Sequence, residues 1–451
     1  MLSKINPAFV FFITGLFLLT FDGGQKALSF QFSIGKSFIL TPRMVDTRSQ
    51  LYPRIASGSS EKCMVVWQQG RNYFQSESGD IYATLVDCTG KPYCGEAISI
   101  CMAGDSQELP EIAFGQDRYL IVWQDLRNHK DWDIYGVFLD QQGGMLDNGE
   151  FKISTGKGSQ AKPMVTTCER GFLIVWQGYS EHFYSIYVAL IGWNGKIHYN
   201  ERLKYENNAL YGGDPEISCI GDKCILSWND EKSWKSTSMS GRMTGRFAAI
   251  SVQDNGVTIT DCQKAPTYFL KGGGRFAKSR EKFLYCIWDN GKRGQSVAVA
   301  ALFDPDKALP KKNLNKEKQR HLSGWNTLQM ISLNPSGVFL DSPLDVNFYR
   351  GNFLVVGRLS ILKHPTPPFQ IVGKILSKDG IKENEDLLPV LHDSRRPVSA
   401  PTLADTGNGL IMVWEQEVSP GKNRIMSKQI GMEKNSNNMV PRQSLSNRNS
   451  K

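Results

Sequence analysis

Charged, polar and aromatic side chains follow a recurring apolar run at several places in the chain. These residues are Arg71, Asn72, Asp125, Arg127, Trp132, Asp230, Asp289, Arg293, Glu415 and Glu417. Carboxylate and guanidinium groups recognise polar ligands through charge-assisted hydrogen bonds. An aromatic ring offers an apolar face to a sugar or a peptide. Trp132 stands out because it lies between Asp131 and Asp133 in a polar segment. Together these residue types fit a binding surface, if the fold brings their segments together.

A structural role competes with ligand binding at each of these positions. Asp125 and Arg127 are two residues apart in a turn-rich segment, so we expect an ion pair or hydrogen bonds to the backbone there. Glu415 and Glu417 would form a hydrolytic pair only if their carboxyl groups were spaced for it across a substrate.

The sequence contains no recognised catalytic or metal motif. Its six histidines are scattered, and H-E-x-x-H, G-x-S-x-G and a phosphate-binding glycine loop are all absent. The glycine-rich segment 271–276 precedes a strand-like run rather than a helix, so a turn explains it. Cysteine and histidine spacings are not those of zinc sites. We therefore expect no metal ion and no cofactor.

A sevenfold repeat would position the candidate residues. The apolar run ends in tryptophan in six copies and at Gly357 in the sixth copy along the chain. The tryptophans are Trp67, Trp123, Trp176, Trp228, Trp288 and Trp414. A proline precedes each anchor by 13 or 14 residues, except in the fifth copy, which has GGGR instead. A period of this length is typical of the blades of a β-propeller.

The repeat predicts an all-β fold, a seven-bladed β-propeller of four-stranded antiparallel blades over residues 30–432. Each copy holds short apolar runs bounded by Gly, Asn and Asp, as strands are. The last copy lacks a fourth run, whereas residues 36–41 (KSFILT) precede the first copy. We expect this N-terminal strand to complete the last blade, which would remove the exposed sheet edges of an open ring. The repeated tryptophan should fill the space between blades, and the loops after it should gather at one end.

One copy carries a recognisable form. Trp123, Asp125, Arg127 and Asn128 give W-x-D-x-R-N, and residues 133–140 give DIYGVFLD. This form resembles repeats of extracytoplasmic bacterial and archaeal β-propeller proteins, TolB-like and sialidase-like in strand pattern. The resemblance implies a fold class rather than an activity. Sialidase-type turns of the form S-x-D-x-G-x-x-W are absent, so sialidase chemistry is not expected.

The two ends of the chain differ from the repeat. Residues 7–21 (PAFVFFITGLFLLTF) carry no charge, and a small-x-small site follows at residues 27–29. This pattern predicts a signal peptide over residues 1–29 and a periplasmic or secreted protein. An uncleaved N-terminal anchor is the alternative, and only then would the protein contact a membrane. Residues 433–451 are polar and predicted to form a disordered tail.

Nine cysteines agree with an oxidising compartment and leave at least one thiol unpaired. Two pairs flank glycine-containing turns between strand-like runs: Cys88 with Cys94, and Cys219 with Cys224. Cross-strand cysteines at such turns can reach disulfide geometry, so both pairs are candidate disulfides.

The formal charge of +9 is partly concentrated in residues 304–320 (DPDKALPKKNLNKEKQR). We interpret this segment as a solvated loop, and expect no nucleic-acid partner, because its basic residues are not interleaved with aromatic ones. We expect a monomeric propeller that binds a protein or glycan partner without catalysis. A glycan-active hydrolase or lyase is the first alternative. A structural role in an envelope assembly, through the 304–320 loop, is the second.

Overall fold

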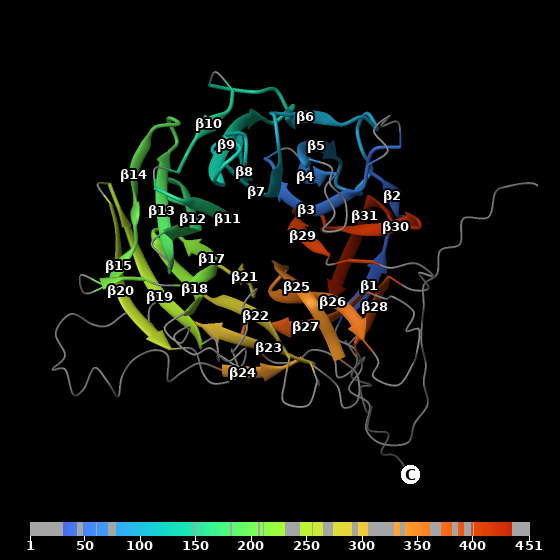
Figure 1. The fold of residues 1–451 in the computed structure, drawn as a ribbon. Coiled ribbons are helices and arrows are strands. Elements are labelled where there is room, and N and C mark those ends of the chain that lie inside the picture. Colours follow the sequence, from blue (N-terminus) through green and yellow to red (C-terminus); the bar gives the residue numbers. More distant parts are fainter. Residues whose placement is uncertain are drawn as a thin grey trace, which may run out of the picture.

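The protein is a closed ring of seven β-sheets in a computed structural model (Figure 1). The structure describes residues 30–42, 48–59, 61–70, 78–147, 149–154, 156–180, 183–205, 208–210, 212–230, 244–254, 256–264, 274–290, 296–304, 329–333, 339–360, 371–380, 387–391, 398–399 and 401–434. The predicted seven-bladed propeller of four-stranded antiparallel blades is confirmed. Within the described residues, no helix is long and apolar enough to span a membrane.

The first four blades follow one another along the chain. Blade 1 contains β3 (Gln50–Ser57), β4 (Cys63–Gln69), β5 (Asp80–Val86) and β6 (Ile98–Cys101). Blade 2 contains β7 (Gln107–Gly115), β8 (Arg118–Asp125), β9 (Asp133–Asp140) and β10 (Phe151–Lys152). Blade 3 contains β11 (Ser159–Cys168), β12 (Gly171–Ser180), β13 (Phe183–Gly192) and β14 (Ile197–Arg202). A small pair, β15 (Lys204–Tyr205) and β16 (Asn208–Ala209), precedes blade 4, which contains β17 (Gly213–Ile220), β18 (Lys223–Asp230), β19 (Thr244–Gln253) and β20 (Gly256–Lys264).

The remaining blades complete the ring. Blade 5 contains β21 (Arg275–Lys278), β22 (Phe283–Asn290), β23 (Ser296–Phe303) and β24 (Gln329–Ser332). Blade 6 contains β25 (Phe339–Tyr349), β26 (Asn352–Ser360), β27 (Ile371–Ser377) and β28 (Leu388–Leu391). Blade 7 contains β29 (Thr402–Asp405), β30 (Leu410–Ser419) and β31 (Lys422–Lys434). The first strand of each blade lies nearest the axis, and we call these seven the inner strands (Figure 1).

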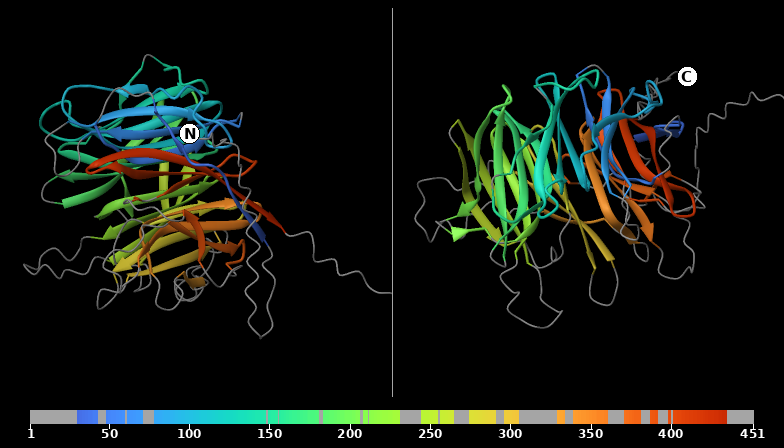
Figure 2. Two further views of the ribbon diagram at one scale, coloured as in Figure 1. Left: turned by 90° about the vertical axis from the view of Figure 1, so that its right-hand side faces the viewer. Right: turned by 45° about the horizontal axis from the view of Figure 1, so that its top comes forward.

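The N-terminal segment closes the ring by pairing with the last strand. β1 (Phe30–Ile34) pairs with β31 from Lys434 to Ile430, and β2 (Phe38–Ile39) pairs with the same strand at Ser427 and Met426. Between them, the Gly35 amide donates to the Gln429 carbonyl at 2.9 Å. The outer strand of blade 7 is therefore one segment interrupted after Ile34, which runs along β31 in Figure 2. The predicted closure is confirmed, although the pairing begins six residues before Lys36.

The repeated tryptophans lie between blades, as predicted. Trp67, Trp123, Trp176, Trp228 and Trp414 are at most 3% exposed. Each belongs to a hydrophobic cluster shared with the preceding blade: Trp123 packs in the cluster of Met64 and Val66 from blade 1, and Trp67 in that of Val413 from blade 7. The side chain of Trp288 lies outside the described residues. An aromatic ring at one fixed place thus fills the space between adjacent sheets.

A β-bulge interrupts the inner strands of the first four blades at the repeat's proline and the residue before it. The residue preceding that proline adopts a positive φ of 51° to 53°, in Tyr52, Leu109, Lys162 and Asp214. Its amide donates to the side chain that follows the tryptophan of the preceding blade, at 2.7 to 3.3 Å: these acceptors are Glu415, Gln68, Gln124 and Gln177. The repeated W-Q or W-E pair therefore joins blades twice, by packing and by this hydrogen bond.

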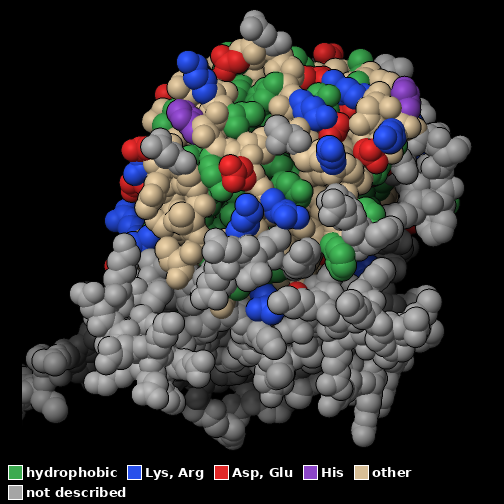
Figure 3. Space-filling model, turned by 60° about the vertical axis from the view of Figure 1, so that its left-hand side comes forward, with side chains coloured by type: hydrophobic (Ala, Val, Ile, Leu, Met, Phe, Trp, Pro, Cys, Tyr) green, Lys and Arg blue, Asp and Glu red, His purple; other side chains and the backbone are tan. Residues whose placement is uncertain are grey.

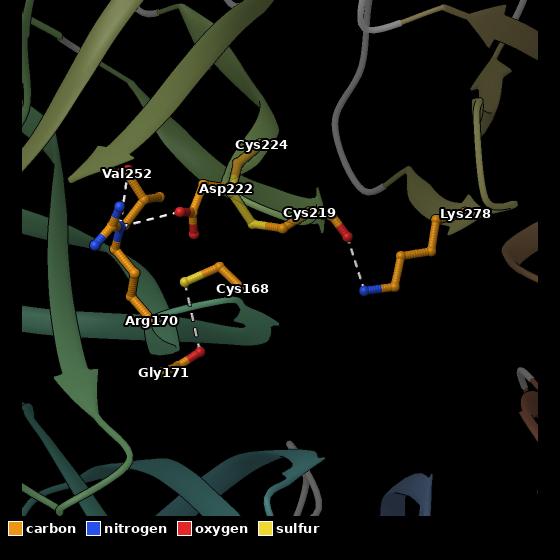
Figure 4. The surroundings of a disulfide bond; sticks show 8 residues. All are labelled: Cys168, Arg170, Gly171, Cys219, Asp222, Cys224, Val252 and Lys278. Carbon is orange, nitrogen blue, oxygen red and sulfur yellow. Dashed lines mark hydrogen bonds and ion pairs between the residues drawn. A yellow bond between two sulfur atoms is a disulfide. The ribbon is translucent and has the colours of Figure 1, made fainter. Parts of the chain in front are cut away.

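One of the two expected disulfides is present. Cys219 and Cys224 pair directly across the β17–β18 hairpin, with Cα atoms 4.0 Å apart, and are bonded (Figure 4). The prediction for Cys88 and Cys94 is wrong, because both are free thiols. The Asp87 amide donates to the Lys91 carbonyl, which places Cys88 in the turn itself. The Tyr93 amide donates to the Leu85 carbonyl, so Cys94 lies farther along the returning strand and not opposite Cys88.

Replacing Trp176 tests the packing between blades 2 and 3. We expect Trp176→Ala to lower the free energy of unfolding by about 3–5 kcal/mol, because the indole is fully buried. Trp176→Phe should cost less, since it keeps a ring but loses the bond from Nε1 to the Gln160 Oε1 at 2.7 Å. Urea unfolding measures both variants. Equal and small losses would contradict the packing role.

Candidate functional site

The described loops that carry candidate residues lie at one end of the ring. At this end the second strand of each blade stops and the inner strands begin, and we call it the loop face. Backbone bonds tie the two sets of loops together: the Leu126 amide donates to the Ser106 carbonyl at 2.9 Å, and the Gln160 amide to the Trp132 carbonyl at 2.6 Å. These bonds hold the described loops of blades 2 and 3 together at this end.

Asp125 and Arg127 hold their own loop. Asp125 is 1% exposed and accepts from the Trp123 Nε1 at 2.8 Å and from the Arg127 guanidinium at 2.6 Å. Arg127 also pairs with Glu150 at 2.7 Å and stacks on the Tyr135 ring at 4.1 Å. Burial opposes the guanidinium charge, but the hydrogen bonds to Asp125 and Glu150 raise the pKa of Arg127. The ion pair that we expected from the spacing of Asp125 and Arg127 is therefore present.

Other candidates are also bound within the fold. Asp230 is buried and paired with Arg246. Glu415 forms the junction to blade 1, and its Oε2 accepts from the Asn423 Nδ2 at 3.2 Å. Burial raises the pKa of Glu415. Glu417 accepts from the Gly421 amide at 2.8 Å within the β30–β31 turn.

Trp132 is half-buried, and its amide donates to the Ser159 Oγ at 3.3 Å, which fixes the loop against blade 3. Arg71, Asn72 and Arg293 lie outside the described residues, as does the side chain of Asp289 in β22. The structure therefore does not gather the ten candidates into one site. The candidate side chains that the structure describes are distributed over blades 2, 4 and 7.

A different set of charged residues converges on the axis. We call it the axial cluster, and its members are Arg54, Glu111, Glu216, Arg275 and Asp345. Each lies on a different inner strand, at or just after the bulge position, so five blades contribute one charge each. Blade 3 contributes Met164 at the equivalent place, and its sulfur lies 3.3 Å from the Arg275 guanidinium.

Arg275 connects carboxylates from two other blades. Its Nη1 lies 2.6 Å from the Glu216 Oε1, and its Nη2 lies 3.4 Å from the Glu111 Oε1. The same Glu111 oxygen accepts from the Arg54 Nε at 2.6 Å. Four charges from blades 1, 2, 4 and 5 thus form one continuous network. The side chains are largely shielded from solvent, with exposed fractions of 24% for Arg54, 12% for Glu111, 10% for Glu216 and 20% for Arg275.

Burial shifts the protonation of two carboxyl groups in the cluster. It raises the pKa of Glu216 to about 8, although Arg275 opposes the shift. Burial also raises the pKa of Asp345, against the effects of Arg275 and of the Leu403 amide, which donates to Asp345 Oδ2 at 2.6 Å. A neutral carboxyl group can donate a hydrogen bond as well as accept one. The neutral form of Glu216 is therefore favoured up to a higher pH than that of an exposed glutamate.

Sequence reasoning did not identify the axial cluster, although a signal for it exists. Arg54, Glu111 and Glu216 each directly follow the proline of their repeat, and Arg275 ends the GGGR that replaces it. The residue after each repeat's proline is thus a sequence signal for a position near the axis. In the described ranges, no three His, Cys, Asp or Glu side chains are grouped as metal ligands would be.

The charged loop expected at residues 304–320 lies outside the described residues beyond Asp304. On the face shown in Figure 3, basic and acidic side chains of the described residues are interspersed.

No protein-family model matches the sequence, and no curated protein matches it. Among solved structures, a protein of unknown function from Dyadobacter fermentans DSM 18053 aligns with a TM-score of 0.49 and 9% identity, over 89% of this chain and 99% of that one. A neuraminidase-like protein from A/bat/Guatemala/164/2009 aligns with a TM-score of 0.40 and 10% identity, over 88% and 93%. The catalytic domain of a Coprinopsis cinerea GH62 alpha-L-arabinofuranosidase aligns with a TM-score of 0.34 and 9% identity, over 59% and 94%. These likenesses concern the fold alone.

Replacing Glu216 should change how stability depends on pH. The pKa of about 8 in the folded protein exceeds the ordinary value of 4.5, so the unfolded chain binds fewer protons between those values. The wild type should therefore lose stability as pH rises from about 5 to about 8, by a few kcal/mol, relative to Glu216→Gln. Urea unfolding across this range measures the difference, with Glu417→Gln as the control. Parallel curves for wild type and Glu216→Gln would refute the shift.

Proposed function

We propose that this propeller is an exported binding protein that recognises a protein or glycan partner through its loop face, without catalysis. The axial cluster carries the proposal. Its carboxyl groups are already held in place: Glu111 by two arginines, Glu216 by Arg275 and Asp345 by the Leu403 amide. Polar groups that are positioned before binding lose little entropy when a ligand arrives, which favours recognition.

Export is supported by two observations of different kinds. The apolar, uncharged segment 7–21 has the character of a signal peptide. The Cys219–Cys224 disulfide is of a type that persists in oxidising compartments. In this proposal the ring acts as a monomer and contacts neither nucleic acid nor, after cleavage of the signal, a membrane.

A matched pair of arginine variants tests the recognition role. Arg54 and Arg118 have similar side-chain exposure, 24% and 25%, and each pairs with a carboxylate. Arg54 belongs to the axial cluster, whereas Arg118 begins β8 at the opposite end of the ring. We expect Arg54→Ala to weaken partner binding about tenfold, the effect of losing about 1.4 kcal/mol. Arg118→Ala should leave binding unchanged.

Binding is measured on a glycan array and by cross-linked pull-down from an envelope fraction. Equal effects of the two substitutions would argue against the axial cluster as the site. Failure of the wild type to retain any glycan or protein in either arm would argue against the whole proposal.

Glycoside hydrolysis is a second candidate, favoured by the bridging position of Arg275. Because one guanidinium contacts both Glu111 and Glu216, their carboxyl groups lie within roughly 10 Å, a range that includes the spacings of glycosidase acid pairs. Glu216, with its raised pKa, would be the general acid, and Glu111 would be the carboxylate that stabilises positive charge or activates water.

The second candidate predicts turnover that depends on Glu216. A polysaccharide hydrolysis screen of the purified protein should then show release of reducing ends, and Glu216→Gln should lower the rate at least about 100-fold. Glu417→Gln, in the β30–β31 turn, should retain full activity. If the wild type releases no reducing ends from any polysaccharide, hydrolysis is excluded as the function on those substrates and recognition stands alone.

A further inference from the structure

The β12–β13 hairpin of blade 3 extends farther beyond its tryptophan than the corresponding hairpin of blade 2. β12 ends at Ser180, four residues beyond Trp176, whereas β8 ends two residues beyond Trp123. Pairing continues to the end, with Tyr179 opposite Tyr184 and Ser180 opposite Phe183. Two additional residues lengthen a strand by about 7 Å. We call the hairpin's paired end at the loop face, residues 179–180 and 183–184, the hairpin tip.

The tip carries aromatic side chains that are accessible to solvent. Tyr179 is 39% exposed and Phe183 is 52% exposed. The rings of Tyr179 and Tyr184 lie with centroids 4.8 Å apart and planes inclined by 49°. Large apolar side chains that gather at an exposed position often mark a binding surface.

The two tyrosines lie on the side of the blade that faces blade 4. Side chains alternate along a strand, so Tyr179 shares its side with Gln177 and with the buried Val175, which packs in the cluster between blades 3 and 4. Gln177 Oε1 accepts from the Asp214 amide of blade 4 at 2.9 Å. The tyrosine pair therefore lies directly above the junction of these two blades.

The same junction leads inward to the axial cluster. Asp214 forms an ion pair with Lys162 of blade 3. Two residues after Asp214 on β17 comes Glu216, which is bound to Arg275 at 2.6 Å. Aromatic rings, an ion pair and the axial charges thus follow one another from the hairpin tip to the axis.

We propose that Tyr179 and Tyr184 form a saccharide-stacking subsite, and that the ligand is an oligosaccharide that runs from the axial cluster along the blade 3–4 junction to this tip. This inference rests on the proposed binding function and specifies its ligand class. The C–H faces of a pyranose ring pack on aromatic faces, while its hydroxyl groups bond to the phenol oxygens and to charged groups such as Lys162 and Asp214. Because the rings of Tyr179 and Tyr184 are inclined to each other, each can present its face to a different sugar unit of the oligosaccharide.

The size of the tip favours a sugar over a protein. A stable protein interface needs about 800 Å² from each partner, whereas the tip offers three aromatic side chains on a hairpin with a two-residue connection. One or two sugar rings match such an area.

Chain-length dependence of binding tests the inference. The probes are oligosaccharides of one to six units from those polysaccharides that the full-length protein retains on a glycan array. We expect wild-type affinity to rise with chain length. In the double variant Tyr179→Ala/Tyr184→Ala, affinity for the longest probes should fall at least tenfold, while affinity for the shortest probes should not change. Tyr179→Phe/Tyr184→Phe should keep most of the length dependence, because the rings remain.

Tyr93→Ala is the matched control, since Tyr93 is 54% exposed on the turn after β5, at the opposite end of the ring. Thermal unfolding of each variant separates loss of binding from loss of fold. If the wild type binds oligosaccharides and the double alanine variant keeps its length dependence, the subsite is wrong while the binding function stands. If the wild type binds a protein and no sugar, the ligand class is wrong. If it binds neither, both proposals fail.

Discussion

The ring depends on one contact that recurs at four junctions between described blades, in which the side chain after the tryptophan accepts a hydrogen bond from the next blade. The donor is the amide of a residue with positive φ, a conformation that costs energy in residues other than glycine. A buried amide without an acceptor would cost more. The acceptor therefore stabilises the bulge, and the bulge aims the residue after the proline at the axis. Packing between blades and the direction of the axial side chains are thus set by the same contact.

The axial cluster follows from that geometry. Inner strands from seven sheets approach a common line, so a charged residue at the same position in several blades must meet charges from the others. Removing charges from water is costly unless they are paired, and the alternation of Arg54, Glu111, Arg275 and Glu216 provides the pairing. The result is a polar centre whose members constrain one another. A substitution at any one of them leaves a partly buried partner without its counter-charge.

The repeat period and the tryptophan anchor were sufficient to predict seven blades, four strands in each and closure by the N-terminal strand. These two signals predicted the fold because both reflect packing between neighbouring blades, and that packing repeats along the sequence. The axial cluster was not found, since its members lie about 50 or more residues apart and become neighbours only once the ring closes. Turn geometry explains which of the two cysteine pairs is bonded. Cys219 and Cys224 flank a two-residue turn symmetrically, whereas Cys88 falls inside its own turn. Loop residues such as Asp125 carry groups that could bind a ligand, but these groups form hydrogen bonds and ion pairs within their own loops.

The pairing of β1 with β31 makes the first and last described residues of the chain neighbours. A ribosome must therefore release nearly the whole polypeptide before the seventh sheet can acquire its outer strand. Contacts between segments separated by about 400 residues form slowly, because a large loss of chain entropy precedes them. Until that pairing forms, blade 7 lacks its outer strand. The pairing of β1 with β31, which closes the ring, is thus a late step of folding.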